Sequence, residues 1–255
     1  MTERWQQRLV EIGALAVLVI GALVANGYHV GLGDHFIHLP FLARAMEPGF
    51  LPGDLIVEAG EHHKSLFWIL QVPIIEAFGL EPSYFAIHLA SLVAMFAGVM
   101  SLARATTPAE HARLVGWLGC IAAMLAPNVF GGIRSMDNHV LNRTVVMGGE
   151  LFALALALRG RGFASMLLCG ILINIHATTA VHTAAFAGCI LLVPPDRWRQ
   201  IARGAVAILL GASPLIIMAL AGDTGPSVEI DHADWYAAVE LHWPFHHFIH
   251  WMDFR

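Results

Sequence analysis

The chain is poor in charge. Only 13% of its 255 residues are Asp, Glu, Lys or Arg, whereas 57% are hydrophobic. A soluble domain carries about 25% charged residues. The mean hydropathy of +0.66 is correspondingly high, and the apolar residues occur in runs of membrane-spanning length. This pattern predicts an all-α, polytopic helical membrane protein.

The sequence lacks the motifs of several common kinds of binding site and active site. The chain has three cysteines, Cys120, Cys169 and Cys189, in apolar segments without CxxC spacing. We expect buried free thiols rather than disulfides or a thiolate metal site. The sequence contains no Gly-rich phosphate loop, nucleophile elbow or HExxH motif, which argues against the enzyme classes that depend on them. No basic patch suits a nucleic acid, so we expect no nucleic-acid partner. The apolar runs lead us to expect membrane lipids as partners.

Long apolar segments alternate with polar ones along the chain. Residues 66–80 are apolar but short and contain Pro73 and Glu76, so we predict a juxtamembrane helix in the outer interface rather than a span of roughly 20 residues. The two segments flanking His176 are short, and a single long helix there is an alternative. In total about seven transmembrane helices are expected, at 9–25, 83–103, 113–126, 145–158, 163–175, 177–193 and 201–221.

The basic residues favour one orientation of these helices. With 66–80 in the interface, the arginines on the side of the N-terminus are Arg4, Arg8, Arg104, Arg113, Arg159, Arg161, Arg197, Arg199 and Arg203. The opposite side has only Arg44, Lys64, Arg134, Arg143 and Arg255. Basic residues concentrate in cytoplasmic loops. We therefore predict a multi-pass protein of the bacterial inner membrane, with a cytoplasmic N-terminus and an outer, periplasmic C-terminus.

Polar and ionisable side chains are concentrated on the predicted outer side. We expect one membrane domain over 1–255, whose outer loops are 27–82, 127–144 and 222–255. Histidines and carboxylates are dense in all three loops, and the third is also rich in Trp and Tyr, which suit a membrane interface. Because these loops share one membrane face, we expect their polar groups to converge into one cavity above the bilayer.

The order of elements on this side resembles the GT-C superfamily of membrane glycosyltransferases. An apolar first helix is followed by a loop with an early aspartate, Asp34, and then by a juxtamembrane segment of the form H-x-x-L-aromatic…F-G-L. The matching residues are 62–68, HHKSLFW, and 78–80, FGL. The C-terminal WPFHHFIHW, 243–251, is similar to a paired-histidine outer motif in uncharacterised bacterial relatives of that fold.

The resemblance implies transfer of a sugar from a polyprenyl-phosphate-linked donor at the outer membrane face. It implies a catalytic or acceptor-orienting role for Asp34 and places Asp137 where a second acidic residue follows the third helix. A base must deprotonate the acceptor hydroxyl, and cations suit the phosphate leaving group. The candidate substrate-binding residues are His35, Asp54, His62, His63, Lys64, Arg134, Asp137, His246 and His247.

Two features depart from the family pattern. His63-Lys64-Ser65 stands where the family has H-P-P, and the sequence stops after the third outer segment, where family members continue with further helices. We therefore expect either a truncated member, active or inactive, or the N-terminal part of a longer protein. The sequence leaves the sugar, the acceptor and the need for a divalent metal open.

Other interpretations of the same residues stay open. Asp34 suits a helix N-cap, and Asp54 suits the Pro-Gly-Asp turn in which it stands. Arg143 is a further candidate for phosphate, but contact with lipid headgroups explains it nearly as well. His242, His246 and His250 recur every four residues, and His35 and His38 are three apart, which are spacings that can hold a metal. A histidine-rich metal-binding or metal-transporting membrane protein is thus the alternative.

Overall fold

The computed structural model describes residues 3–54, 57, 63, 65–125, 137–193 and 195–221. Over these residues the chain forms helices and turns without any β-strand, as the sequence predicts. The helices are α1 (Glu3–Asn26), α2 (His35–Met46), α4 (Phe67–Phe78), α5 (Leu80–Thr106), α6 (Ala109–Leu125), α7 (Asn142–Leu158), α8 (Gly162–Ile173), α9 (Ala177–Leu191) and α10 (Arg197–Ala221).

Three of these helices, α1, α5 and α10, are long and apolar enough to cross a membrane. Helices α6 and α7 have 17 residues each, and α8 and α9 have 12 and 15. A full span needs roughly 20 residues, so membrane association follows from the three long helices while the count of seven spans stays a prediction. α8 and α9 are two separate, contacting helices, and the alternative of one long helix does not apply.

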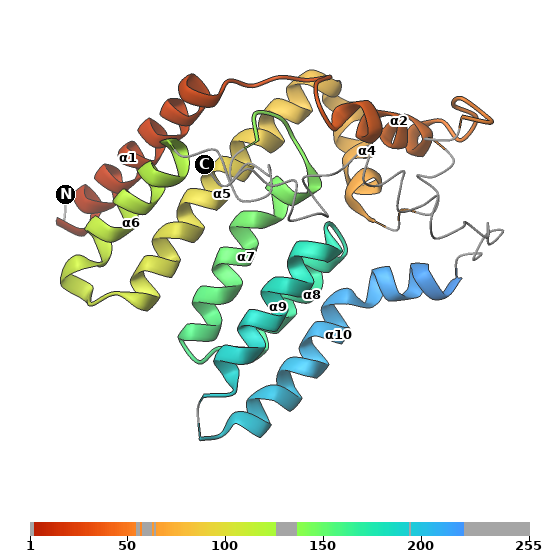
Figure 1. Cartoon of the computed structure of the whole chain (residues 1–255). Helices are drawn as coiled ribbons and strands as arrows, with labels where there is room; N and C mark the ends of the chain where they lie inside the picture. The colour runs from red at the N-terminus through yellow and green to blue at the C-terminus, as the bar shows by residue number, and fades with distance from the viewer. Residues whose placement is uncertain are drawn as a thin grey trace, which may run out of the picture.

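The long helices lie side by side, and α2 and α4 cover one end of the bundle (Figure 1). Helix α5 is central because it contacts α1, α4, α6 and α7. Buried apolar side chains from α1, α5 and α6, including Ala22, Phe96 and Cys120, form one core. Other large apolar side chains of α1 and α10 are exposed, such as Val24 and Leu220, each at 82%. An apolar surface of this kind suits contact with lipid.

Helices α5 and α7 approach each other closely at a glycine. A Cβ atom added at Gly148 would lie 2.5 Å from the backbone carbonyl carbon of Ala94. That distance is far below van der Waals contact, so only glycine allows this approach. Small residues at helix contacts are the usual means of packing helices in membranes, where burial of apolar surface gives little driving force.

The α8–α9 turn is joined to α10 through a side-chain amide. Pro214 interrupts the hydrogen bonds of α10, and Asn174 supplies replacements. Its Oδ1 accepts from Leu215 N at 2.8 Å, and its Nδ2 donates to Gly211 O at 2.8 Å. Helix α10 bends in its second half (Figure 1). Proline and an inserted side chain both produce such bends, and in an apolar environment the freed backbone groups must find partners.

The Asn174→Ala variant tests this junction. It leaves Leu215 N and Gly211 O without their partners in a buried region, and an unsatisfied buried backbone group costs about 1–3 kcal/mol. We expect a clearly lower melting temperature in detergent. Thr106→Ala, which removes an exposed bond from Thr106 Oγ1 to Leu102 O at the end of α5, is the control and should change little. Equal melting of the two variants would contradict the inferred role of Asn174.

The two ends of the bundle differ in charge. The connections α5–α6, α7–α8 and α9–α10 lie at the end where the first helix begins (Figure 1). Among the described residues the arginines near this end are Arg8, Arg104, Arg113, Arg159, Arg161, Arg197, Arg199 and Arg203. We call it the arginine end. The other end carries α2, α4 and the residues that precede α7, and we call it the Asp34 end.

Candidate functional site

At the Asp34 end, the chain after α1 and the chain before α7 are bonded together. His29 N donates to Asn138 O at 2.8 Å. The buried His35 ring lies 2.8 Å from Val140 O through Nε2, while its Nδ1 accepts from Gly31 N at 3.0 Å. These two bonds require the neutral tautomer with hydrogen on Nε2. His35 therefore fixes the loop that carries Asp34, and both of its nitrogens are occupied by backbone groups.

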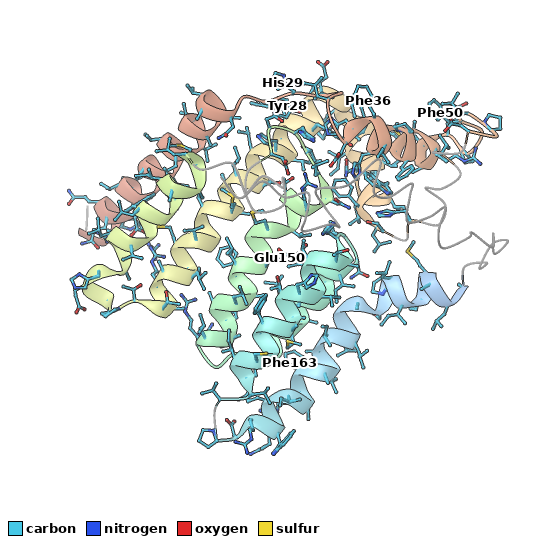
Figure 2. The ribbon with its side chains drawn as sticks, in the orientation of Figure 1. Tyr28, His29, Phe36, Phe50, Glu150 and Phe163 are labelled. Carbon is cyan, nitrogen blue, oxygen red and sulfur yellow. The ribbon has the colours of Figure 1, made fainter. Side chains whose placement is uncertain are left out.

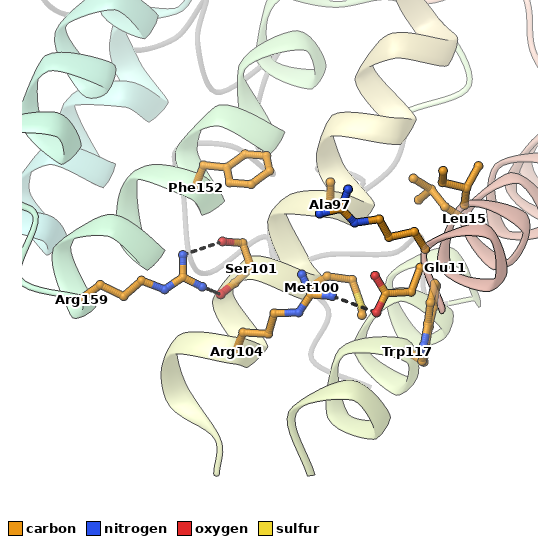
Figure 3. A pocket seen from close by; sticks show the side chains of 11 residues that line it. Glu11, Leu15, Ala97, Met100, Ser101, Arg104, Trp117, Phe152 and Arg159 are labelled. Carbon is orange, nitrogen blue, oxygen red and sulfur yellow. Dashed lines mark hydrogen bonds and ion pairs between the residues drawn. The ribbon is translucent and has the colours of Figure 1, made fainter. Parts of the chain in front are cut away.

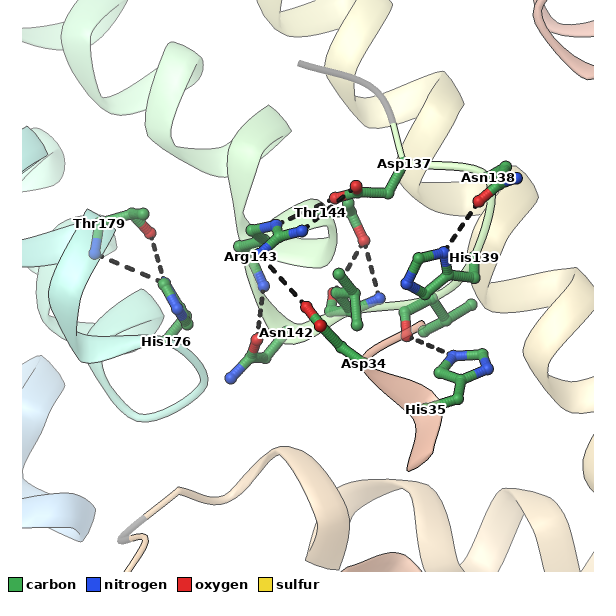
Figure 4. A network of polar contacts seen from close by, with 12 residues as sticks. Asp34, His35, Asp137, Asn138, His139, Asn142, Arg143, Thr144, His176 and Thr179 are labelled. Atoms are coloured by element: carbon green, nitrogen blue, oxygen red, sulfur yellow. Dashed lines mark hydrogen bonds and ion pairs between the residues drawn. The ribbon is translucent and has the colours of Figure 1, made fainter. Parts of the chain in front are cut away.

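Arg143 joins the two aspartates proposed from the sequence (Figure 4). Its Nε and Nη2 donate to the Asp137 carboxylate at 3.0 and 3.2 Å, and its Nη1 lies 3.5 Å from Asp34 Oδ2. Arg143 is the second residue of α7, and its backbone N–H donates to Asn142 Oδ1 at 2.9 Å. Asp34 and Asp137, which are 103 positions apart in the chain, thus belong to one ionic cluster.

The two carboxylates differ in environment. Asp137 is 5% exposed and has a bidentate partner, an arrangement that is strong and geometrically specific. The Asp34 side chain is 49% exposed and has the single, longer contact. Asp34 occupies the N-cap position of α2, but its side chain makes no capping hydrogen bond. Helix capping therefore does not account for this aspartate, whereas pairing with Arg143 does.

Three histidines next to this cluster are held neutral by burial. Burial lowers the pKa of His38 to about 4, although the negative charge of Asp34 acts in the opposite direction. Burial also lowers the pKa of His35 and of His139. His139 Nδ1 lies 2.9 Å from Asn138 Oδ1. Within the described part of the chain, His38 Nδ1 and His139 Nε2 have no hydrogen-bond partner.

The α8–α9 turn and the start of α4 meet at the same end. Leu66 N donates to Asn174 O at 2.7 Å, and Ser65 Oγ donates to Ile175 O at 2.8 Å. His63 lies near the aromatic rings of Phe41 and Trp68, and burial lowers the pKa of His63. Segments from four parts of the sequence therefore gather at the Asp34 end.

Asp54 does not join the Asp34 cluster. It follows a turn in which Asp54 N donates to Leu51 O at 3.2 Å, and its Oδ1 accepts from Val57 N at 3.1 Å. This turn follows the C-terminal end of α2, which has 12 residues and is about 18 Å long. Figure 2 shows Phe36 and Phe50 near opposite ends of that helix. These contacts are local to the turn that contains Asp54, and its proposed substrate-binding role stays a prediction.

The remaining proposed residues, His62, Lys64, Arg134, His246 and His247, lie outside the residues that the structure describes, as do His242 and His250. Within the described ranges no group of three His, Cys, Asp or Glu side chains could hold a metal ion.

Asp137 and His88 line a hollow of only about 10 Å³, which is room for about one water. A larger ligand would therefore reach this cluster from the exposed side of Asp34.

Sequence reasoning named both aspartates but missed the function of Arg143 in pairing them. A signal was present, because Asp137 and Arg143 are six positions apart in one polar segment.

Comparison with known proteins does not identify the chain. No family model matches it, and no curated protein or solved structure is significantly similar to it.

Removing Arg143 should destabilise the protein far more than removing Asp34. Arg143→Met leaves the buried Asp137 charge without its cation, for which we expect a loss of about 3–5 kcal/mol in the free energy of unfolding. Asp34→Asn removes one half-exposed ion pair, which is worth about 1 kcal/mol or less. Denaturant titration of the two variants in detergent measures both values. Similar losses for both would contradict the unequal burial of the two carboxylates.

Acidification should also destabilise the Asp34 end. Because the pKa of folded His38 is lowered to about 4 from the ordinary 6.5, the unfolded chain binds more protons between these values, and stability falls as the pH falls through this window. We expect the His38→Phe variant to lose less melting temperature between pH 7.5 and pH 4.5 than the parent protein. The exposed His111 provides the control variant, His111→Gln. An unchanged pH dependence in His38→Phe would refute this assignment.

Proposed function

We propose that the protein is a membrane glycosyltransferase of GT-C type, which transfers a sugar from a polyprenyl-phosphate-linked donor to an acceptor hydroxyl. The observation that carries the proposal is the carboxylate of Asp34, half exposed at the end of an apolar helical bundle and paired with Arg143. A lipid-linked substrate would have its polar headgroup at this end of the bundle, next to the Asp34 carboxylate. The order of motifs around Asp34 supports the same assignment.

In this proposal Asp34 is the general base. The acceptor oxygen attacks C1 of the sugar while its proton passes to the Asp34 carboxylate. The bond between C1 and the phosphate oxygen breaks, and its electron pair leaves with polyprenyl phosphate. Arg143, anchored by the buried Asp137, orients Asp34. Lys64 and Arg134 are the cations proposed to stabilise the departing phosphate, and His246 and His247 are proposed to line the donor cavity.

We further propose seven spans, a cytoplasmic N-terminus and residence in a bacterial inner membrane. The side-by-side helices and the concentration of arginines at one end support this orientation, because basic residues gather on the cytoplasmic side. The Asp34 end then faces the periplasm. The short α8 and α9 would cross through local thinning of the bilayer.

The test uses the full-length protein in lipid nanodiscs with polyprenyl-phosphate-linked glucose and, separately, mannose as donors. Release of free polyprenyl phosphate reports both transfer and hydrolysis by water, so no acceptor needs to be known. We expect release by the parent protein and a loss of at least about 100-fold in Asp34→Asn, on the order of the usual contribution of a general base. Melting temperature verifies that the variant is folded.

Asp196→Asn is the matched control, because Asp196 is an exposed aspartate at the arginine end. It should release polyprenyl phosphate at the parent rate. A folded parent protein that consumes neither donor would refute the transferase proposal and favour an inactive relative. An undiminished rate in Asp34→Asn would refute the assignment of the base.

A further inference from the structure

The arginine end contains a second site, which is independent of the chemistry at Asp34. A hollow of about 400 Å³ opens there between α1, α5, α6 and α7 (Figure 3). Arg8, Arg104 and Arg159 line it together with a single carboxylate, Glu11. Figure 3 shows Glu11 near Arg104 and Trp117 and, on the far side of the hollow, Arg159, which directly follows α7.

The positive charge of the hollow is only partly neutralised. Glu11 is shared, because its Oε1 lies 3.4 Å from Arg104 Nη2 and 3.4 Å from Nη2 of Arg113. Arg159 donates to the hydroxyl of Ser101 at 3.2 Å and to its backbone carbonyl at 2.9 Å, and both of these acceptors are neutral. A guanidinium has five N–H donors, so Arg159 retains donors for an anion.

The walls beside these arginines are apolar. Ile12 and Leu15 follow Arg8 on α1, and Ala97 and Met100 precede Arg104 on α5. On both helices the apolar residues thus lie nearer the middle of the bundle, and the arginines lie nearer its end. Trp117 also lines the hollow, and tryptophan is enriched at the membrane interface. The hollow is therefore cationic at its mouth and apolar behind it.

We propose that this hollow binds an anionic glycerophospholipid. Its phosphodiester would contact Arg104 and Arg159, and one acyl chain would lie along Leu15 and Met100. Basic pockets between transmembrane helices bind anionic lipid headgroups in this way, and guanidinium groups suit phosphate geometry. Charge complementarity selects an anionic over a zwitterionic lipid, and the apolar wall selects a lipid over a soluble phosphate.

The experiment counts lipids retained by the full-length protein in native mass spectrometry after exchange into mixed micelles containing phosphatidylglycerol or phosphatidylcholine. We expect selective retention of phosphatidylglycerol. The double variant Arg104→Gln/Arg159→Gln should bind it on the order of 30-fold more weakly, since each basic residue near anionic lipid contributes about a fivefold factor. Arg161→Gln/Arg199→Gln changes the charge equally at exposed positions of the same end, outside the lining, and should bind as the parent does.

Glu11→Gln provides a test that misfolding cannot imitate. It removes the carboxylate shared by Arg104 and Arg113, and we expect it to retain phosphatidylglycerol more tightly than the parent. The proposal is overturned if both lipids are retained equally, if the Arg161/Arg199 control loses as much binding as the Arg104/Arg159 variant, or if millimolar inorganic phosphate displaces the lipid completely, which would indicate a soluble-anion site.

Discussion

The pairing of one guanidinium with two carboxylates organises the Asp34 end of the molecule. Arg143 is anchored by the buried Asp137 through two hydrogen bonds and reaches Asp34 through its remaining Nη1. A buried carboxylate requires a partner because its desolvation is costly, and Arg143 is that partner for Asp137. Arg143 also pairs with the half-exposed Asp34, whose loop His35 holds to the residues before α7 through its bond to Val140 O.

The helical bundle below this cluster depends on how backbone groups are satisfied and how closely helices approach. Asn174 supplies partners to the two α10 backbone groups next to Pro214, and Gly148 allows α7 to lie directly against α5. Both features suit helices that are surrounded by lipid, where unpaired backbone groups are costly and helix contact relies on fit. The α8–α9 turn, fixed by Asn174, also receives a backbone bond from Leu66 at the start of α4.

Most of the helices were predictable because each apolar run in the sequence has a helical length of its own. The predicted segment at 66–80 became α4 (Phe67–Phe78), and the segments on either side of His176 became α8 and α9. Helix packing was not predictable, because it depends on which glycines meet a neighbouring backbone and on which polar side chain fills a gap in another helix. Asn174 and Gly148 are ordinary residues of apolar segments until their neighbours are known.

For the site, the sequence shows which residues carry charge in the polar segments, and Asp34 and Asp137 were identified from it. It did not show that Arg143 pairs with both or that His35 has both nitrogens bonded to backbone groups. Composition and periodicity depend on near neighbours in the chain, so they reveal helices. An ion pair across 109 positions, as between Asp34 and Arg143, depends on the path of the folded chain, which brings the two residues together.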